Sequence, residues 1–371
     1  MSGKGPASAA ADPGIGEVRL HVVSGKGGTG KSTVSTALAI ALASGGRRVL
    51  LAEVEGRQGI AHLLGAEPLG YPERRLLAAP GGGEVLGLSV QPEAALLEYL
   101  DVAFHLGRAG RLLEKLGAID FATTVAPGLR DVLLTGKVYE AVRRRSGGEY
   151  AYHAVVLDAP PTGRITRFLR ANGEMAGLAS GGPIHNQAES IMSLLRSPRT
   201  AVHLVTLLEE MPVQETAEAL EELRVAGLRT GTVVLNLVRE RLLPAADLPS
   251  AARGALDAGA VSAGLVTAGL GGRTPAPGRA FVPAPGSAGR ESGTTERRAH
   301  PDRTERLARL AEDLAEEAAA HAARALLEEE LRGTAISWEL PTVELPALGN
   351  GVDEGTLYEL ARHLREQGMV R

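Results

Sequence analysis

The segment Ser24–Thr33 combines glycines, lysines and hydroxyl side chains at a spacing that suits phosphate binding. Within it, Gly25–Ser32 fits the pattern G-x-x-x-x-G-K-[ST], after a short apolar run and before a helical stretch. Glycines let consecutive backbone N–H groups point at phosphate oxygens, and a helix N-terminus adds the positive end of its dipole. The pattern therefore predicts an ATP-binding P-loop. The predicted nucleotide-binding residues of this loop are Gly25, Lys26, Gly27, Gly28, Thr29, Gly30, Lys31, Ser32 and Thr33.

Three side chains of the loop have separate predicted roles. Lys31 should reach the β- and γ-phosphates, and the Ser32 hydroxyl should ligate Mg²⁺. Lys26 directly follows the first glycine, where a second lysine can neutralise phosphate charge across a dimer interface. Only five of the 40 basic residues are lysine, and two of those five lie in this loop. Their retention in an arginine-rich chain indicates specific chemistry.

A second motif ends another apolar run. Asp158 follows Val155–Leu157 and precedes Ala-Pro-Pro-Thr-Gly. An acid that ends an apolar strand is typical of the Walker B position, where its carboxylate holds a water on Mg²⁺. The predicted metal-site residues are therefore Ser32 and Asp158. Gly163 would give the following loop freedom to sense a γ-phosphate.

Composition restricts the class of protein. The chain has 371 residues, is 44% apolar and has a formal net charge of −4, which is typical of a globular protein. Its mild acidity provides no overall attraction to nucleic acid. It has no cysteine, which excludes disulfides, thiolate metal sites and cysteine-bound iron–sulfur clusters. No signal peptide and no membrane-spanning apolar run are apparent, so we expect a cytoplasmic protein without an integral membrane segment.

Strands and helices alternate along the chain. Short apolar runs at 18–24, 48–52, 85–90, 154–158, 201–207 and 232–237 predict buried strands, and helical periods follow most of them. This alternation predicts an α/β fold with a doubly wound, mainly parallel sheet of the P-loop NTPase type. A helical insertion is expected at about 92–146. It is either a set of crossover helices or a subdomain that meets a partner.

The remaining segments set the predicted domain organisation. Residues 1–16 are small and polar and predict a disordered tail. Residues 17–371 are expected to form a single P-loop ATPase domain. A flexible linker rich in Gly, Pro and Arg is predicted at about 271–303. Helices are predicted at 303–332 and 353–367, the latter packing on the core, with an extended stretch at 340–348.

These motifs together resemble a known family. The sequence Gly-Lys-Gly-Gly-Thr-Gly-Lys-Ser is similar to the deviant Walker A loop of ATPases that dimerise around nucleotide. The run Asp158–Gly163 narrows the resemblance to the arsenical-pump (ArsA-type) and tail-anchored-protein-targeting ATPases. It is closest to the actinobacterial arsenical-pump-like paired ATPases. The resemblance covers nearly the whole chain outside 1–16 and 271–303. It implies that Asn236 contacts adenine and that Pro346 packs against the base.

The sequence departs from this family at two points. The family has an aspartate in its first switch, and Glu55 stands at the matching place. The resemblance implies that Lys26, Lys31, Glu55 and Asp158 carry catalysis. The extra methylene of Glu55 predicts slow hydrolysis without a partner, because a misplacement of about 1 Å can cost about 10²-fold in rate. The absence of cysteine removes the metalloid site and the zinc site found in many members.

The leading hypothesis is a dimeric ATP-binding and hydrolysing switch that needs ATP and Mg²⁺ and engages a protein client. The dimer would contain two copies of the chain or one copy and a related ATPase. Two alternatives remain open. One is a partition- or division-type positioning ATPase, although basic and acidic residues are interleaved and no nucleic-acid partner is expected. The other is a nucleotide-binding scaffold subunit of a heterodimer with weak hydrolysis.

Overall fold

The computed structural model of the chain describes residues 18–54, 56, 58–104, 129–178, 183–269, 303–349 and 351–370. The predicted tail 1–16, most of the predicted linker 271–303, and Glu55 lie outside the described residues. The chain divides into two compact units, 1–240 with 331–371 and 241–330. The predicted single domain and its boundaries stay a prediction.

An eight-stranded sheet forms the centre of the first unit, in the order β10-β9-β8-β1-β7-β2-β4-β3. All neighbouring pairs are parallel except β3 and β4. The α/β fold with a mainly parallel sheet is therefore confirmed. The strands are β1 (Leu20–Gly25), β2 (Arg48–Val54), β3 (Arg74–Ala79), β4 (Gly83–Val90), β7 (Ala154–Asp158), β8 (Thr200–Thr206), β9 (Thr230–Val238) and β10 (Thr342–Pro346).

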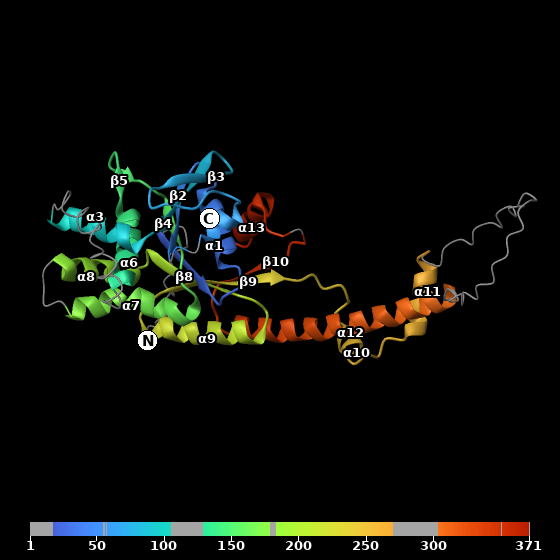
Figure 1. The fold of residues 1–371 in the computed structure, drawn as a ribbon. Coiled ribbons are helices and arrows are strands. Elements are labelled where there is room, and N and C mark those ends of the chain that lie inside the picture. The colour runs from blue at the N-terminus through green and yellow to red at the C-terminus, as the bar shows by residue number, and fades with distance from the viewer. Residues whose placement is uncertain are drawn as a thin grey trace, which may run out of the picture. The chain divides into compact units, whose positions relative to one another are not determined.

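Helices cover both faces of this sheet (Figure 1). Because successive strand residues point to opposite faces, each strand supplies two cores. In β7, Val155 and Leu157 join the core with α3, α6, α7, α8 and α9, whereas Ala154 and Val156 join the core with α1, α2 and α13. These helices are α1 (Lys31–Ala43), α2 (Gly59–Leu63), α3 (Pro92–Phe104), α6 (Leu129–Arg143), α7 (Thr162–Leu178), α8 (Pro183–Leu195), α9 (Glu210–Val225) and α13 (Glu354–Glu366).

The predicted helical insertion is partly described. It contains α3 and α6, and residues 105–128 between them lie outside the described residues. The final helix α13 buries Leu357, Leu360, Ala361 and Leu364 and packs on α1, which confirms the expectation that it lies on the core. Among the described residues, no helix is both long enough and apolar enough to cross a membrane.

The second unit contains α10 (Leu248–Ala252), α11 (Ala258–Thr267) and the first part of α12 (Arg303–Ile336). Its small core joins Leu248 and Ala251 to Ala322. No residue of α11 is buried.

The two outer strands of the sheet were not equally visible in the sequence. The extended stretch predicted at 340–348 contains β10, whereas β3, which pairs antiparallel with β4, was not predicted. At the β10 edge, the Gln367 side chain donates to Glu344 O (2.7 Å) and accepts from Glu344 N (2.8 Å). The carboxylate of Glu344 pairs with Arg332 at 2.7 Å.

Two histidines face each other in the middle of the sheet. His21 of β1 and His203 of β8 are fully buried, with His21 Nδ1 3.1 Å from His203 Nε2. The Thr232 N–H donates to His203 Nδ1 (3.0 Å), so the His203 proton lies on Nε2 and points at His21. Burial lowers the pKa of His21 to about 4 and the pKa of His203 well below its usual value. Both rings are therefore neutral at pH 7.

We expect the free energy of unfolding to fall as the pH is lowered from about 6.5 toward 4. The unfolded chain protonates both imidazoles in this range, whereas the folded chain keeps them neutral, so acid favours the unfolded state. His21 alone should contribute a loss of about 3 kcal/mol by pH 4, at about 1.4 kcal/mol per pH unit. Urea unfolding at several pH values measures the slope. A free energy that stays level between pH 7 and pH 5 would contradict this account.

Candidate nucleotide-binding site

The P-loop connects the end of β1 to the start of α1. β1 ends at Gly25 and α1 begins at Lys31, so the loop's glycines stand directly before a helix N-terminus. The loop is closed on itself by Thr29 Oγ1 and Lys31 Nζ, which both donate to Lys26 O, at 2.9 and 3.0 Å. A Cβ at Gly27 or at Gly28 would meet no atom within 4 Å. That side of the loop is therefore open, as a phosphate cradle requires.

Asp158 lies beside the start of α1, as the sequence predicts. It is the last residue of β7, is 7% exposed, and pairs in register with Val23 of β1. The Ser32 hydroxyl donates to Asp158 Oδ2 at 2.6 Å, and Ser35 Oγ lies 3.3 Å from Oδ1. The two predicted metal-site residues are therefore in direct contact.

A second carboxylate at this edge of the sheet was missed by the sequence reasoning. Glu53 of β2 is only 2% exposed and is the register partner of Asp158. Its Oε1 accepts from the Gly59 N–H at 2.6 Å, at the start of α2. A Cβ on Gly59 would lie 3.1 Å from Ser32 Oγ and 3.4 Å from Glu53 Oε1. Glu53 therefore ties the start of α2 to the edge of the sheet where Asp158 lies. An acid within the apolar run of β2 was the available signal.

The residues predicted to contact the base lie on neighbouring strands. Asn236 of β9 is 4% exposed, and its Nδ2 donates to Thr29 O at 2.8 Å. Asn236 therefore contacts the P-loop, and its pairing with adenine stays a prediction. Pro346 ends β10 and is the register partner of Val238, so it lies at the same carboxyl edge of the sheet. Glu55 is outside the described residues, and its predicted catalytic role has no structural account.

Comparison with known proteins gives the family. The model of the anion-transporting ATPase family matches residues 18–192, which contain the P-loop, Glu53 and Asp158. The ATPase BagA of Mycobacterium tuberculosis is 45% identical over 353 residues, covering 95% of this chain and 94% of that protein. The chain belongs to the ArsA-type anion-transporting ATPase family.

More distant relatives cover part of the chain. The arsenical pump-driving ATPase of Escherichia coli is 25% identical over 258 residues, which is 62% of this chain and 41% of that protein. The ATPase get3 of Schizosaccharomyces pombe is 28% identical over 180 residues, which is 46% of this chain and 51% of that protein. As a member of the ArsA-type family, the protein is an ATP-binding ATPase.

The distinctive lysine of this ArsA-type ATPase is paired within its own chain. Lys26 Nζ lies 2.8 Å from Glu215 Oε1 of α9, and both side chains are about one-third exposed, at 30% and 32%. The other oxygen, Oε2, accepts from Thr162 Oγ1 at 3.3 Å. Thr162 begins α7, four residues after Asp158, and Gly163 lies in the first turn of this helix, not in a loop. Glu215 thus links the P-loop to the segment after Asp158.

The residues present suit Mg²⁺ and a nucleotide. Across the described residues, no group of three or more His, Cys, Asp and Glu side chains can hold a metal ion. A magnesium ion in such a site is held by one or two carboxylates and by the substrate phosphates. Ser32 and Asp158 supply a hydroxyl and a carboxylate in contact, beside an open loop. When bound, Mg²⁺ neutralises charge on the phosphates. Ser32, Asp158 and Lys31 would hold and orient the metal–nucleotide complex.

We expect Gly30→Ala to lower both the melting temperature and the ATP affinity, the affinity by at least about tenfold. Gly30 has φ 87°, a left-handed conformation that costs alanine roughly 1–2 kcal/mol. An added Cβ would also lie 2.4 Å from Asn236 Nδ2, so the bond from Asn236 to Thr29 would have to move. Thermal unfolding and ATP titration measure the two effects.

Gly27→Ala is the matched control for this substitution. A Cβ at Gly27 meets nothing within 4 Å, so this variant should keep the wild-type melting temperature. Equal melting temperatures for the Gly30 and Gly27 variants would contradict the packing argument for Gly30.

Proposed function

We propose that this ArsA-type ATPase is a dimeric switch in which ATP joins two subunits and hydrolysis releases them. The observation that carries the proposal is that the side chains of the two loop lysines make different contacts. Lys31 Nζ lies within its own loop, on Lys26 O, whereas Lys26 Nζ points to Glu215 of α9. The Lys26 side chain is therefore not needed to close its own loop, and it is placed to exchange Glu215 for the phosphates of a partner.

Glu215 also suggests how the nucleotide state is transmitted. It bonds to Lys26 in the P-loop and to Thr162 after Asp158, so release of Lys26 would free the start of α7. α7 packs beside α6 and α8 on one face of the sheet. A change at its first turn would therefore reach the helical insertion, which we propose as the surface for a protein client. Segments that order around a γ-phosphate and relax on its loss are a recurrent switch design.

The partner is either a second copy of the chain or a related ATPase. We propose slow turnover without the partner or client, below about one per second, because Glu55 stands where a shorter acid orients water in related ATPases. The proposal places Mg²⁺ on Ser32 and Asp158. The position of α13 supports this switch over a membrane-positioning ATPase, because its apolar face is buried against α1.

Sedimentation of the purified chain with ATP, ADP or no nucleotide tests the proposal. ATP should shift the wild-type protein from monomer to dimer, and ADP should not. Lys31→Ala should stay monomeric because it binds ATP poorly. Lys26→Ala should bind ATP but form a weaker dimer. A chain that binds ATP as an unchanging monomer without turnover would contradict the homodimeric switch and support a heterodimer or scaffold subunit.

A further inference from the structure

A second polar pocket opens at the opposite edge of the sheet from the P-loop. It has a volume of ≈ 510 Å³, within the range of small-molecule sites. Arg19 precedes β1 and Arg199 precedes β8, so the pocket lies at the amino ends of the strands. β1 has six residues, which separates the two sites by roughly 20 Å. The pocket is thus distinct from the nucleotide site.

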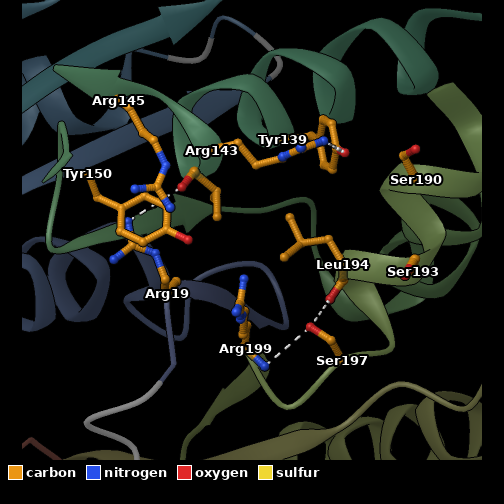
Figure 2. A pocket seen from close by; sticks show the side chains of 11 residues that line it. Arg19, Tyr139, Arg143, Arg145, Tyr150, Ser190, Ser193, Leu194, Ser197 and Arg199 are labelled. Atoms are coloured by element: carbon orange, nitrogen blue, oxygen red, sulfur yellow. Dashed lines mark hydrogen bonds between the residues drawn. The ribbon is translucent and has the colours of Figure 1, made fainter. Parts of the chain in front are cut away.

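Four arginines line this pocket, as Figure 2 shows: Arg19, Arg143, Arg145 and Arg199. No Asp or Glu is among its described lining residues. The acids of the adjoining helices have other partners, since Glu140 of α6 bonds to Arg144 and Glu189 of α8 lies 3.3 Å from His185. The lining of the pocket therefore carries a concentrated positive charge.

Arg19 makes several contacts within this cluster. Its guanidinium donates to Tyr152 O at 2.7 Å and to His153 O at 3.2 Å, and it stacks on the Tyr150 ring at 3.5 Å from the centroid. Burial lowers the pKa of Arg19; the contact with Tyr150 acts to raise it, and the charges of Arg199 and Arg145 lower it. The neighbouring guanidiniums thus repel one another, and a bound anion would relieve this repulsion.

The remaining polar groups of the pocket are hydroxyls. Ser190, Ser193 and Ser197 come from α8 and the turn after it, and Tyr139 from α6 accepts a hydrogen bond from Arg143. Tyr150 stands against Arg145, 4.2 Å from the ring centroid (Figure 2). Slight burial acts to raise the pKa of Tyr150, but the charges of Arg145, Arg199 and Arg19 outweigh it and lower that pKa.

We propose that this pocket binds a small molecule with at least two phosphoryl groups. Guanidinium forks match phosphate oxygens bidentately. Ser190 and Ser197 already donate to the carbonyls of Asn186 and Leu194, which leaves the Ser193 hydroxyl of the pocket to donate to a phosphate oxygen. Two phosphoryl groups carry a charge of about −3 to −4 at pH 7, which balances four arginines. A solvent-open hollow of this size has room for a compact solute. The proposal is independent of the dimeric switch, because it concerns the other edge of the sheet.

Calorimetric titration with inorganic pyrophosphate tests the proposal on the full chain. The titration compares wild type, Lys31→Ala, the double variant Arg143→Ala with Arg199→Ala, and Arg362→Ala. Arg362 is an exposed arginine of α13 paired with Glu366, so its removal changes charge away from the pocket. Pyrophosphate should bind wild type, Lys31→Ala and Arg362→Ala at the second site. The double variant should bind there about 100-fold more weakly, because two charge-assisted contacts are lost.

Two results of the pyrophosphate titration would overturn the proposal. The first is loss of all pyrophosphate binding in Lys31→Ala, which would assign the binding to the P-loop alone. The second is unchanged binding in the double variant. The double variant and the Arg362 variant should both keep the wild-type melting temperature, because the substituted arginines are exposed. Such a result would confirm that both variants are folded.

Further titrants separate the possible ligand sources. Citrate that binds this pocket as tightly as pyrophosphate would overturn the preference for phosphoryl groups. Vesicles containing phosphatidic acid distinguish a lipid headgroup from a free solute. If vesicle binding is lost in the Arg143 and Arg199 double variant, and pyrophosphate does not bind the wild-type chain, a soluble ligand is ruled out. The expected result is pyrophosphate binding that depends on the pair, with no vesicle binding.

Discussion

Replacement of Lys26 by alanine is expected to lower the turnover number for ATP hydrolysis by about 10³-fold or more. A cation that reaches the transferred phosphoryl group from a second subunit stabilises charge that develops in the transition state. ATP affinity should change by less than about threefold, because Lys31 and the loop backbone are expected to hold the phosphates in the same chain. Steady-state hydrolysis and equilibrium ATP binding measure the two quantities separately.

The Lys26–Glu215 ion pair makes a matched control possible. Lys26→Ala and Glu215→Gln break the same 2.8 Å ion pair from its two sides. If Lys26 serves only to stabilise its own chain, both variants should lose activity equally. If Lys26 acts on a partner's phosphates, Glu215→Gln should retain most of the activity, since it releases the lysine. Equal losses of ATPase activity in the two variants would contradict the proposal that Lys26 acts on a partner's phosphates across a dimer interface.

Asp158→Asn is expected to reduce turnover by about 10²- to 10³-fold and to raise the Mg²⁺ concentration needed for half-maximal activity. Asp158 Oδ2 accepts from the Ser32 hydroxyl at 2.6 Å, so the carboxylate both orients Ser32 and supplies negative charge. Asparagine can keep one acceptor oxygen but loses the charge. Hydrolysis measured across a Mg²⁺ titration separates a metal effect from a nucleotide effect.

Two further variants serve as comparisons for Asp158→Asn. Ser35→Ala removes the other hydroxyl near Asp158, at 3.3 Å, and should leave the Mg²⁺ requirement unchanged. Glu53→Gln keeps an acceptor for the Gly59 N–H and removes only the charge, so we expect the turnover number for ATP hydrolysis to fall by about tenfold. A Mg²⁺ requirement that is unchanged in Asp158→Asn would mean that Asp158 does not act through the metal.

Most features that could be predicted depend on a single contiguous stretch of the sequence. The P-loop needs only one stretch of chain between a strand and a helix, so its residues could be predicted directly from the sequence. The Asp158 position followed from an apolar run with an acid at its end. Both motifs depend on local order, and the parallel sheet then brings strand ends to a common edge.

Contacts between distant residues could not be predicted in the same way. The ion pair of Lys26 with Glu215 joins residues 189 positions apart in the sequence, and no spacing rule indicates it. Glu53 was missed because an acid within an apolar strand resembles an interruption until its register with Asp158 is known. β3 was missed because Arg74–Ala79 lacks strict alternation and pairs antiparallel at the edge, with an irregular register.

The β10 edge bears on how the protein behaves at high concentration. An open edge strand is a template on which another chain can add a strand and begin aggregation. Here the Gln367 side chain occupies both main-chain groups of Glu344, and Pro346 has no N–H to offer. Growth of the sheet from one molecule into the next is therefore blocked at this rim. The subunit association that we propose would therefore use other surfaces, without competition from a fibrous, irreversible pairing at this strand.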